Sequence, residues 1–212
     1  MTTSDKFSQV RQAHRICAAF YQYIFPMLNQ VTENLGMDFI KWEKWSFKKL
    51  SRQSTNPLTT WSWNSLPMMD VSFVFGKKTT NGTILTPEDF VLDLSLIIDH
   101  ELEYSTRIEN YGENVEPDAC KLKLNAEESE SYIAIYLFSL IKKNKNYTSL
   151  EDIWYADEDY PKMDSKIHKS KDVQSIGFKV NLNEIAKDDG AIILLKKINQ
   201  HLKKLGIKTH KI

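Results

Sequence analysis

F-V-L-D-L-S-L-I-I-D-H-E-L, residues 90–102, is the longest alternating stretch of the chain. Apolar residues and His100 fill its even positions, and the odd positions continue to residue 103 with several polar side chains: Asp93, Ser95, Asp99, Glu101 and Glu103. A period of two sends successive side chains to opposite faces of a strand. The stretch therefore predicts an antiparallel strand with one buried and one solvated face.

Further strands are predicted on both sides of this stretch. Val71, Phe73 and Phe75 alternate ahead of Asn81-Gly82, a dipeptide typical of tight hairpin turns. Residues 131–141 are apolar at both odd and even positions, as expected of a central strand covered on both faces. Residues 176–182 alternate again. These segments together predict a sheet built mainly from antiparallel neighbours.

Two helices are predicted at the ends of the chain. The N-terminal helix has apolar residues in steps of three and four up to Gly36, on the stripe Phe7, Val10, His14, Cys17, Tyr21, Ile24, Leu28, Val31 and Leu35. This unbroken stripe predicts a central helix. It is also compatible with dimerisation, but His14 in the stripe and the few flanking charge pairs favour packing within the chain. The C-terminal helix has an inward stripe that ends before Gly206, at Leu195, Ile198, Leu202 and Leu205.

The predicted fold class is α+β, with a twisted, mainly antiparallel sheet flanked by a long N-terminal helix and a C-terminal helix. No internal repeat or low-complexity linker interrupts residues 1–212. A chain of this length matches one ample domain. We therefore expect a single α+β domain over 1–212.

Several function classes lack their sequence signatures. The seven glycines form neither a dinucleotide-binding nor a P-loop pattern, and no H-E-x-x-H occurs. The first residues carry charges, and no long uncharged apolar run follows. The two cysteines, Cys17 and Cys120, are far apart, which favours reduced core thiols over a disulfide. We expect a cytoplasmic protein with no cofactor and no membrane partner.

The zero net charge hides a segregation along the chain. Residues 1–78 carry 10 basic and 5 acidic side chains (+5), residues 79–164 carry 7 and 19 (−12), and residues 165–212 carry 11 and 4 (+7). Such asymmetry bears on partners more than on fold. The acidic middle block suggests a basic protein as partner, or neutralisation by the basic blocks within the domain. The 24 lysines against 4 arginines disfavour sequence-specific recognition of nucleic acid.

Four of the five tryptophans lie between residues 42 and 63. Trp61 and Trp63 are two apart on a predicted strand, so both indoles would point to one face. Such a pair forms a stacking platform for a sugar, a base or a methylated amine. The alternative roles are a corner of the core and a buried anchor for a protein partner.

The acidic residues of the 90–103 stretch form the second candidate site. On one strand face, Asp93, Asp99 and Glu101 would share a hydrated Mg²⁺ or Mn²⁺ and serve a metal-dependent hydrolase or nuclease. The alternative is a solvated face, because no second element offers a matching ligand. No catalytic or metal-ligating residue is therefore assigned.

Three functions follow as hypotheses. The first is a non-enzymatic protein-binding module of the inhibitor or immunity type, with an acidic central surface. Its predicted contact residues are Trp61, Trp63, Asp99, Glu101 and Glu103. The second is the metal-dependent hydrolase or nuclease. The third is a small-molecule or glycan binder that uses Trp61 and Trp63.

Overall fold

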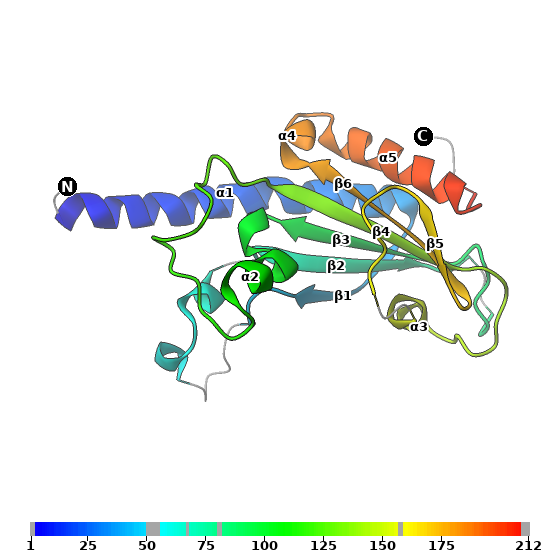
Figure 1. Ribbon diagram of the computed structural model, residues 1–212. Helices are drawn as coiled ribbons and strands as arrows, with labels where there is room; N and C mark the ends of the chain where they lie inside the picture. Colours follow the sequence, from blue (N-terminus) through cyan, green and yellow to red (C-terminus); the bar gives the residue numbers. More distant parts are fainter. Residues whose placement is uncertain (1–2, 50–55, 67, 80–81, 157–158, 209–212) are drawn as a thin grey trace.

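A computed structural model describes residues 3–49, 56–66, 68–79, 82–156 and 159–208, and it confirms the α+β fold (Figure 1). A six-stranded antiparallel sheet carries a long N-terminal helix and a C-terminal helix on one face. In chain order the elements are α1 (Thr3–Leu35), β1 (Asp38–Lys44), η1 (Pro57–Thr59), η2 (Ser62–Ser65), β2 (Asp70–Lys77), β3 (Phe90–Ile97), η3 (His100–Leu102), α2 (Tyr104–Tyr111), β4 (Tyr132–Leu140), α3 (Leu150–Tyr155), β5 (Ile167–Ser170), β6 (Val173–Asn181), α4 (Leu182–Ile185) and α5 (Gly190–Lys204).

The strands lie in the order β1-β2-β3-β4-β6-β5, and every neighbouring pair is antiparallel. The predicted pairing of β2 with β3 is confirmed, but their connection is longer than a tight turn, because β2 ends at Lys77 and β3 begins at Phe90. The Asp89 carboxylate holds this connection by accepting hydrogen bonds from the backbone N–H groups and hydroxyls of Thr79 and Thr86. Asn81 lies outside the described residues.

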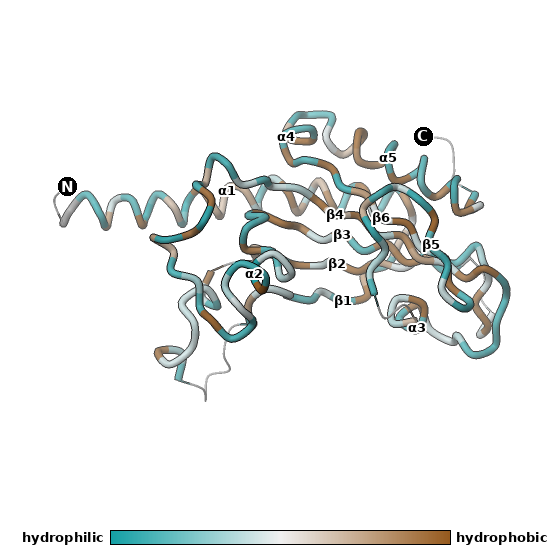
Figure 2. The backbone as a smooth tube through the Cα atoms, viewed as in Figure 1, coloured by the Kyte–Doolittle hydropathy of each residue, from teal (hydrophilic) through white to brown (hydrophobic). Residues whose placement is uncertain are grey.

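The main core lies between the sheet and the helices α1 and α5. Apolar residues at alternate strand positions, such as Leu94 and Ile135, meet the inward sides of both helices. Figure 2 shows the hydrophobic residues concentrated along the central strands. The C-terminal stripe is confirmed, since Leu195, Ile198 and Leu202 are buried. Gly206, at φ +80°, follows the helix in a conformation that other residues rarely adopt.

The opposite face of the sheet is also covered. A second core forms there from β3, β4 and β6 against α3, with Ile153 and Trp154 buried under the helix. The prediction of a central strand over 131–141 is confirmed, because every residue of β4 is buried. The prediction of a half-solvated strand over 90–102 is wrong, because all eight residues of β3 are buried on both faces and the strand ends at Ile97.

The N-terminal helix packs on the sheet over only half of its length. A helix of 33 residues is about 50 Å long at 1.5 Å per residue, whereas an eight-residue strand spans only about 27 Å. The helix therefore projects beyond the sheet (Figure 1). We call residues 5–19 the arm, and every one of them is exposed. The prediction of central packing along the whole stripe is thus wrong for Phe7 and Val10.

Both cysteines lie at the surface of the molecule, one of them on the arm. Cys17 lies on the arm and is exposed, and Cys120 is exposed in the loop that follows α2. The prediction of core thiols is therefore wrong for both. Among the described residues, no helix combines the length and apolar character needed to cross a bilayer.

Candidate functional site

The acidic residues of the 90–103 stretch do not share one face. Asp93 is fully buried under α3, where its carboxylate accepts hydrogen bonds from Trp154 Nε1 at 3.1 Å and from the Tyr160 hydroxyl at 2.6 Å. Asp99 lies beyond the end of β3 and caps η3, accepting from the backbone N–H of Glu101 at 3.1 Å. The predicted shared strand face is therefore wrong, because the strand ends before Asp99.

Glu101 and Glu103 are occupied inside the fold. Glu101 is buried and accepts hydrogen bonds from the backbone N–H groups of Lys123 and Leu124 and from the Tyr111 hydroxyl. Its carboxylate thus anchors the loop after α2. Glu103 accepts from the Tyr132 hydroxyl at 2.8 Å and pairs with His100 Nδ1 at 2.8 Å.

The hydrogen bonds of these carboxylates inside the fold affect both roles predicted for them, as metal ligands and as contacts for a protein partner. Among the residues that the structure describes, no three His, Cys, Asp or Glu side chains gather as a metal site. Glu101 is also too deeply buried to contact a protein partner. The geometry therefore supports neither the metal site nor a contact surface centred on this carboxylate.

The two predicted platform tryptophans do not share a face. They lie at η2, a 3₁₀ helix, where Trp61 is the residue that precedes the helix and Trp63 is inside it. Trp63 is buried, stacks on Phe47 with ring centroids 5.5 Å apart, and donates from Nε1 to the Pro117 carbonyl at 2.7 Å. The core-corner role is therefore right for Trp63. Trp61 is only half-buried and faces a different neighbour, Arg107.

A pocket of about 520 Å³ opens between the end of β1, the turn around η1 and η2, and α2. Trp61 and three further aromatic residues line it: Trp45, Phe47 and Tyr104. Trp45 is held in place because its Nε1 donates to Ser72 Oγ at 2.8 Å. The pocket is thus an aromatic-walled site of small-molecule size.

Arg107 lies in the wall of this pocket and is its central charged group. The residue is only 3% exposed, although it comes from the short surface helix α2. Its Nε donates to Ser46 Oγ at 3.0 Å, and its Nη1 lies 3.4 Å from the carbonyls of Gly112 and Glu113. The second fork nitrogen, Nη2, has no hydrogen-bond partner in the described part of the chain.

Aromatic rings lie around the guanidinium, and the carboxylates of Asp70 and Glu113 act on it only through their charge, without a direct ion pair. Its central carbon lies 5.5 Å from the Trp61 ring, 5.7 Å from the Phe47 ring and 5.8 Å from the Tyr104 ring. No Asp or Glu of the described residues forms an ion pair with it. Burial lowers the pKa of Arg107, but a guanidinium stays charged at neutral pH. A buried cation of this kind suits an incoming anion.

The remaining charges of the pocket are also mainly positive. Lys44 and Lys48 line the wall beside Arg107, against the single carboxylate of Glu113. Burial lowers the pKa of Lys44, whose ammonium donates to the Leu66 carbonyl at 3.3 Å. Three cations against one anion give the pocket a positive field for an anionic ligand.

Asp70, the first residue of β2, is joined to the pocket residue Tyr104. Its carboxylate accepts a hydrogen bond from the backbone N–H of Tyr104 at 2.9 Å, which fixes the start of α2. Burial raises the pKa of Asp70 to about 7, and the nearby positive charge of Arg107 acts in the opposite direction. The carboxyl group therefore titrates close to neutral pH.

This raised pKa predicts how stability changes with pH. The folded chain keeps a proton on Asp70 that the unfolded chain releases at about pH 4, so the free energy of unfolding falls as pH rises from about 4 to about 7. In Asp70→Asn the free energy of unfolding is expected to fall less over this pH range. The part of the fall that remains comes from Asp93, whose pKa is also raised by burial. Urea denaturation over that pH range measures both profiles. Identical slopes in the native chain and in Asp70→Asn would show the interpretation to be wrong.

Arg107 carries no signal that the sequence analysis used. It is a lone arginine inside the acidic middle block and belongs to no motif. Its neighbours in the pocket come from residues 44–48 and 59–64, which only the fold brings to α2. Of the predicted contact residues, only Trp61 reaches this site.

Comparison with known proteins gives one match. The family model described as PM0109 matches residues 2–206, almost the whole length of the sequence. No curated protein and no solved structure matches the sequence.

Proposed function

The chain belongs to the PM0109 family, and from this premise we propose that it binds a flat organic anion in the Arg107 pocket. One observation carries the proposal: the buried guanidinium of Arg107 has a free fork nitrogen and forms no ion pair with a carboxylate of the described residues. A carboxylate or phosphate fits this fork and neutralises the buried charge.

The aromatic walls specify the rest of the ligand. Trp45, Trp61 and Tyr104 line the same cavity, and aromatic rings favour a planar body by stacking. The described lining residues include neither a histidine nor a cysteine, the side chains most used as bases and nucleophiles. We therefore propose binding without chemical conversion of the ligand.

Matched pairs of probes test this proposal. Benzoate against benzyl alcohol, and adenosine monophosphate against adenosine, differ in charge while keeping the ring. Titration calorimetry is expected to show binding of at least one anion, at least about tenfold tighter than that of its neutral counterpart. Equal affinity within both pairs, or no binding of any probe, would contradict the proposal.

A tryptophan substitution tests the stacking wall. Trp61→Ala is expected to lower the affinity for the bound anion about tenfold, because one ring face is lost. The melting temperature should change little, since Trp61 is only half-buried. Trp42→Ala is the control, because Trp42 is also accessible to solvent but is not among the residues that line the pocket. Equal affinity loss in both variants would argue against a role for Trp61.

We propose protein binding as a second candidate function, in a cytoplasmic chain and with a basic protein as partner. The observation that favours it is the loop of residues 112–131, which we call the acidic loop. It carries six acidic and two basic side chains. The carboxylate of Glu127 is exposed and forms no hydrogen bond or ion pair in the described part of the chain. An affinity pull-down with the native chain and with Glu127→Lys tests it, and equal capture by both would contradict it.

A further inference from the structure

The arm presents an apolar surface that the described part of the chain does not cover. Phe7 is 61% exposed and Val10 52%, and both lie on the stripe that continues into the buried half of α1. A helix of this length is marginally stable in water when it has no partner. Exposed apolar residues that continue the stripe of a buried helix are typical of a contact surface.

The charge of the arm defines the partner that it suits. Residues 5–19 carry Lys6, Arg11 and Arg15 against the single acid Asp5, a net charge of 3 − 1 = +2. The three cations have no hydrogen-bond or ion-pair partner among the described residues. The arm therefore favours a surface that is both apolar and acidic.

The acidic loop of the same chain has these properties. Its net charge is 2 − 6 = −4, and its side chains Val115 and Leu124 are exposed between the charges. The loop is held in shape by the buried Glu101, whose carboxylate accepts hydrogen bonds from the backbone N–H groups of Lys123 and Leu124. It thus offers a preformed counterpart to the arm.

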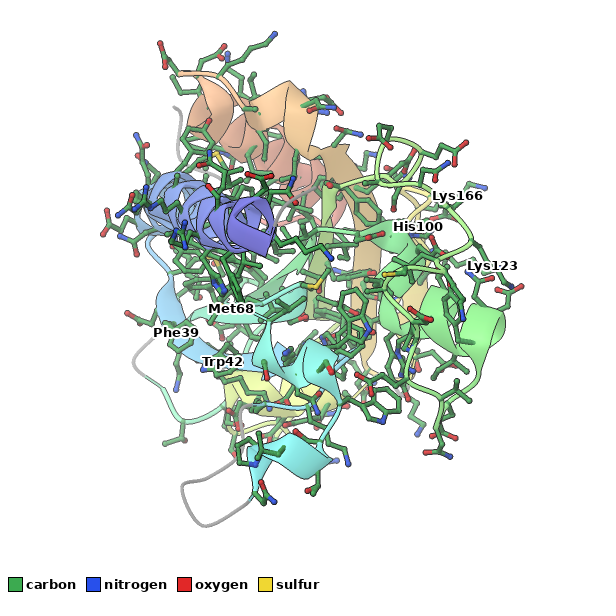
Figure 3. All side chains as sticks on the ribbon, turned by 90° about the vertical axis from the view of Figure 1, so that its left-hand side faces the viewer. Phe39, Trp42, Met68, His100, Lys123 and Lys166 are labelled. Atoms are coloured by element: carbon green, nitrogen blue, oxygen red, sulfur yellow. The ribbon has the colours of Figure 1, made fainter. Side chains whose placement is uncertain are left out.

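The arm and the acidic loop lie at the same end of the molecule, on opposite sides of it. In Figure 3, which looks onto that end, helix α1 points toward the viewer on the left and Lys123 of the acidic loop lies on the right. A chain cannot bend its own straight helix across this end. A two-fold axis that passes between the two features, however, places the arm of each copy beside the acidic loop of the other.

We propose that two copies of this chain associate reciprocally, with the arm of each copy lying along the acidic loop of the other. The inference rests on the second candidate function, and it identifies the basic surface that the acidic loop contacts as the arm of a second copy. Direct pairing of two arms is disfavoured, since it would bring the cations of both arms together.

Charge reversal tests the pairing, and the readout is the mass in solution measured by light scattering and sedimentation. The native chain is expected to dimerise, with weaker association at about 0.5 M salt than at about 0.05 M. Arg11→Glu with Arg15→Glu, or Glu127→Lys with Glu128→Lys, is expected to raise the dissociation constant at least about tenfold. All four reversals together should restore much of the affinity, because the charges again complement each other.

Two controls make the outcome specific. Val10→Asp on the arm should weaken the dimer, whereas Ile192→Asp, at an exposed position on α5, should not. Circular dichroism checks that each variant is folded. A monomeric native chain, or a dimer insensitive to both reversals, would overturn the inference. A monomer whose pull-down of another protein still depends on Glu127 would overturn the inference and leave the second candidate function standing.

Discussion

Arg107→Met is expected to weaken the binding of a flat organic anion at least about 100-fold. The substitution puts an unbranched apolar side chain in place of arginine. It removes the guanidinium group that the anion would contact. Each charge-assisted hydrogen bond contributes about 1.5–3 kcal/mol, so two of them amount to a factor of this size. Titration calorimetry with the best-binding probe measures the effect.

Arg107→Lys separates charge from geometry. It retains the positive charge but loses the planar fork, so an intermediate loss of about tenfold is expected. Both variants also lose the hydrogen bond to Ser46, so binding is measured well below their melting temperatures. Unchanged affinity in Arg107→Met would show that the anion binds elsewhere.

Asp93→Ala is expected to lower the free energy of unfolding by about 3–5 kcal/mol. The substitution leaves three donors, Trp154 Nε1 and the hydroxyls of Tyr160 and Ser95, without their acceptor, and an unmet buried donor costs about 1–3 kcal/mol. It also opens a small space under α3. Urea denaturation measures the change.

Asp93→Asn is the matched variant. It keeps a side-chain oxygen as acceptor and has no charge to bury, so its loss should stay below about 2 kcal/mol. Asp38→Ala, at an exposed position in the edge strand β1, should change stability by less than about 0.5 kcal/mol. Equal stability of Asp93→Ala and the native chain would contradict the structural role given to this carboxylate.

Periodicity predicted the elements but not which of their faces are covered. The alternation in 90–97 is real, and it correctly predicts β3. Its polar side is nevertheless buried, because Trp154 and Tyr160 come from later in the chain to cover Asp93. A local pattern cannot reveal this cover, since its residues are more than 60 positions away.

The dependence on distant parts of the chain also explains the wrong predictions for α1 and for the candidate site. The stripe of α1 correctly predicts one long helix, but burial along it is set by the length of the sheet beneath. The spacing of Trp61 and Trp63 is equally compatible with a strand and with the observed 3₁₀ helix. Arg107 gains its role only from tertiary neighbours, so no sequence pattern identifies it.

The most direct test of the central claim follows the arginine Nε–Hε resonances by NMR. The chain has four arginines, at positions 11, 15, 52 and 107, so this spectrum is sparse, and Arg107→Met assigns the Arg107 signal. Addition of benzoate or adenosine monophosphate is expected to shift the Arg107 resonance and to leave those of Arg11 and Arg15 in place, whereas the neutral counterparts should leave all of them unmoved. An Arg107 resonance that stays unmoved at saturating concentrations of both anions would contradict the account.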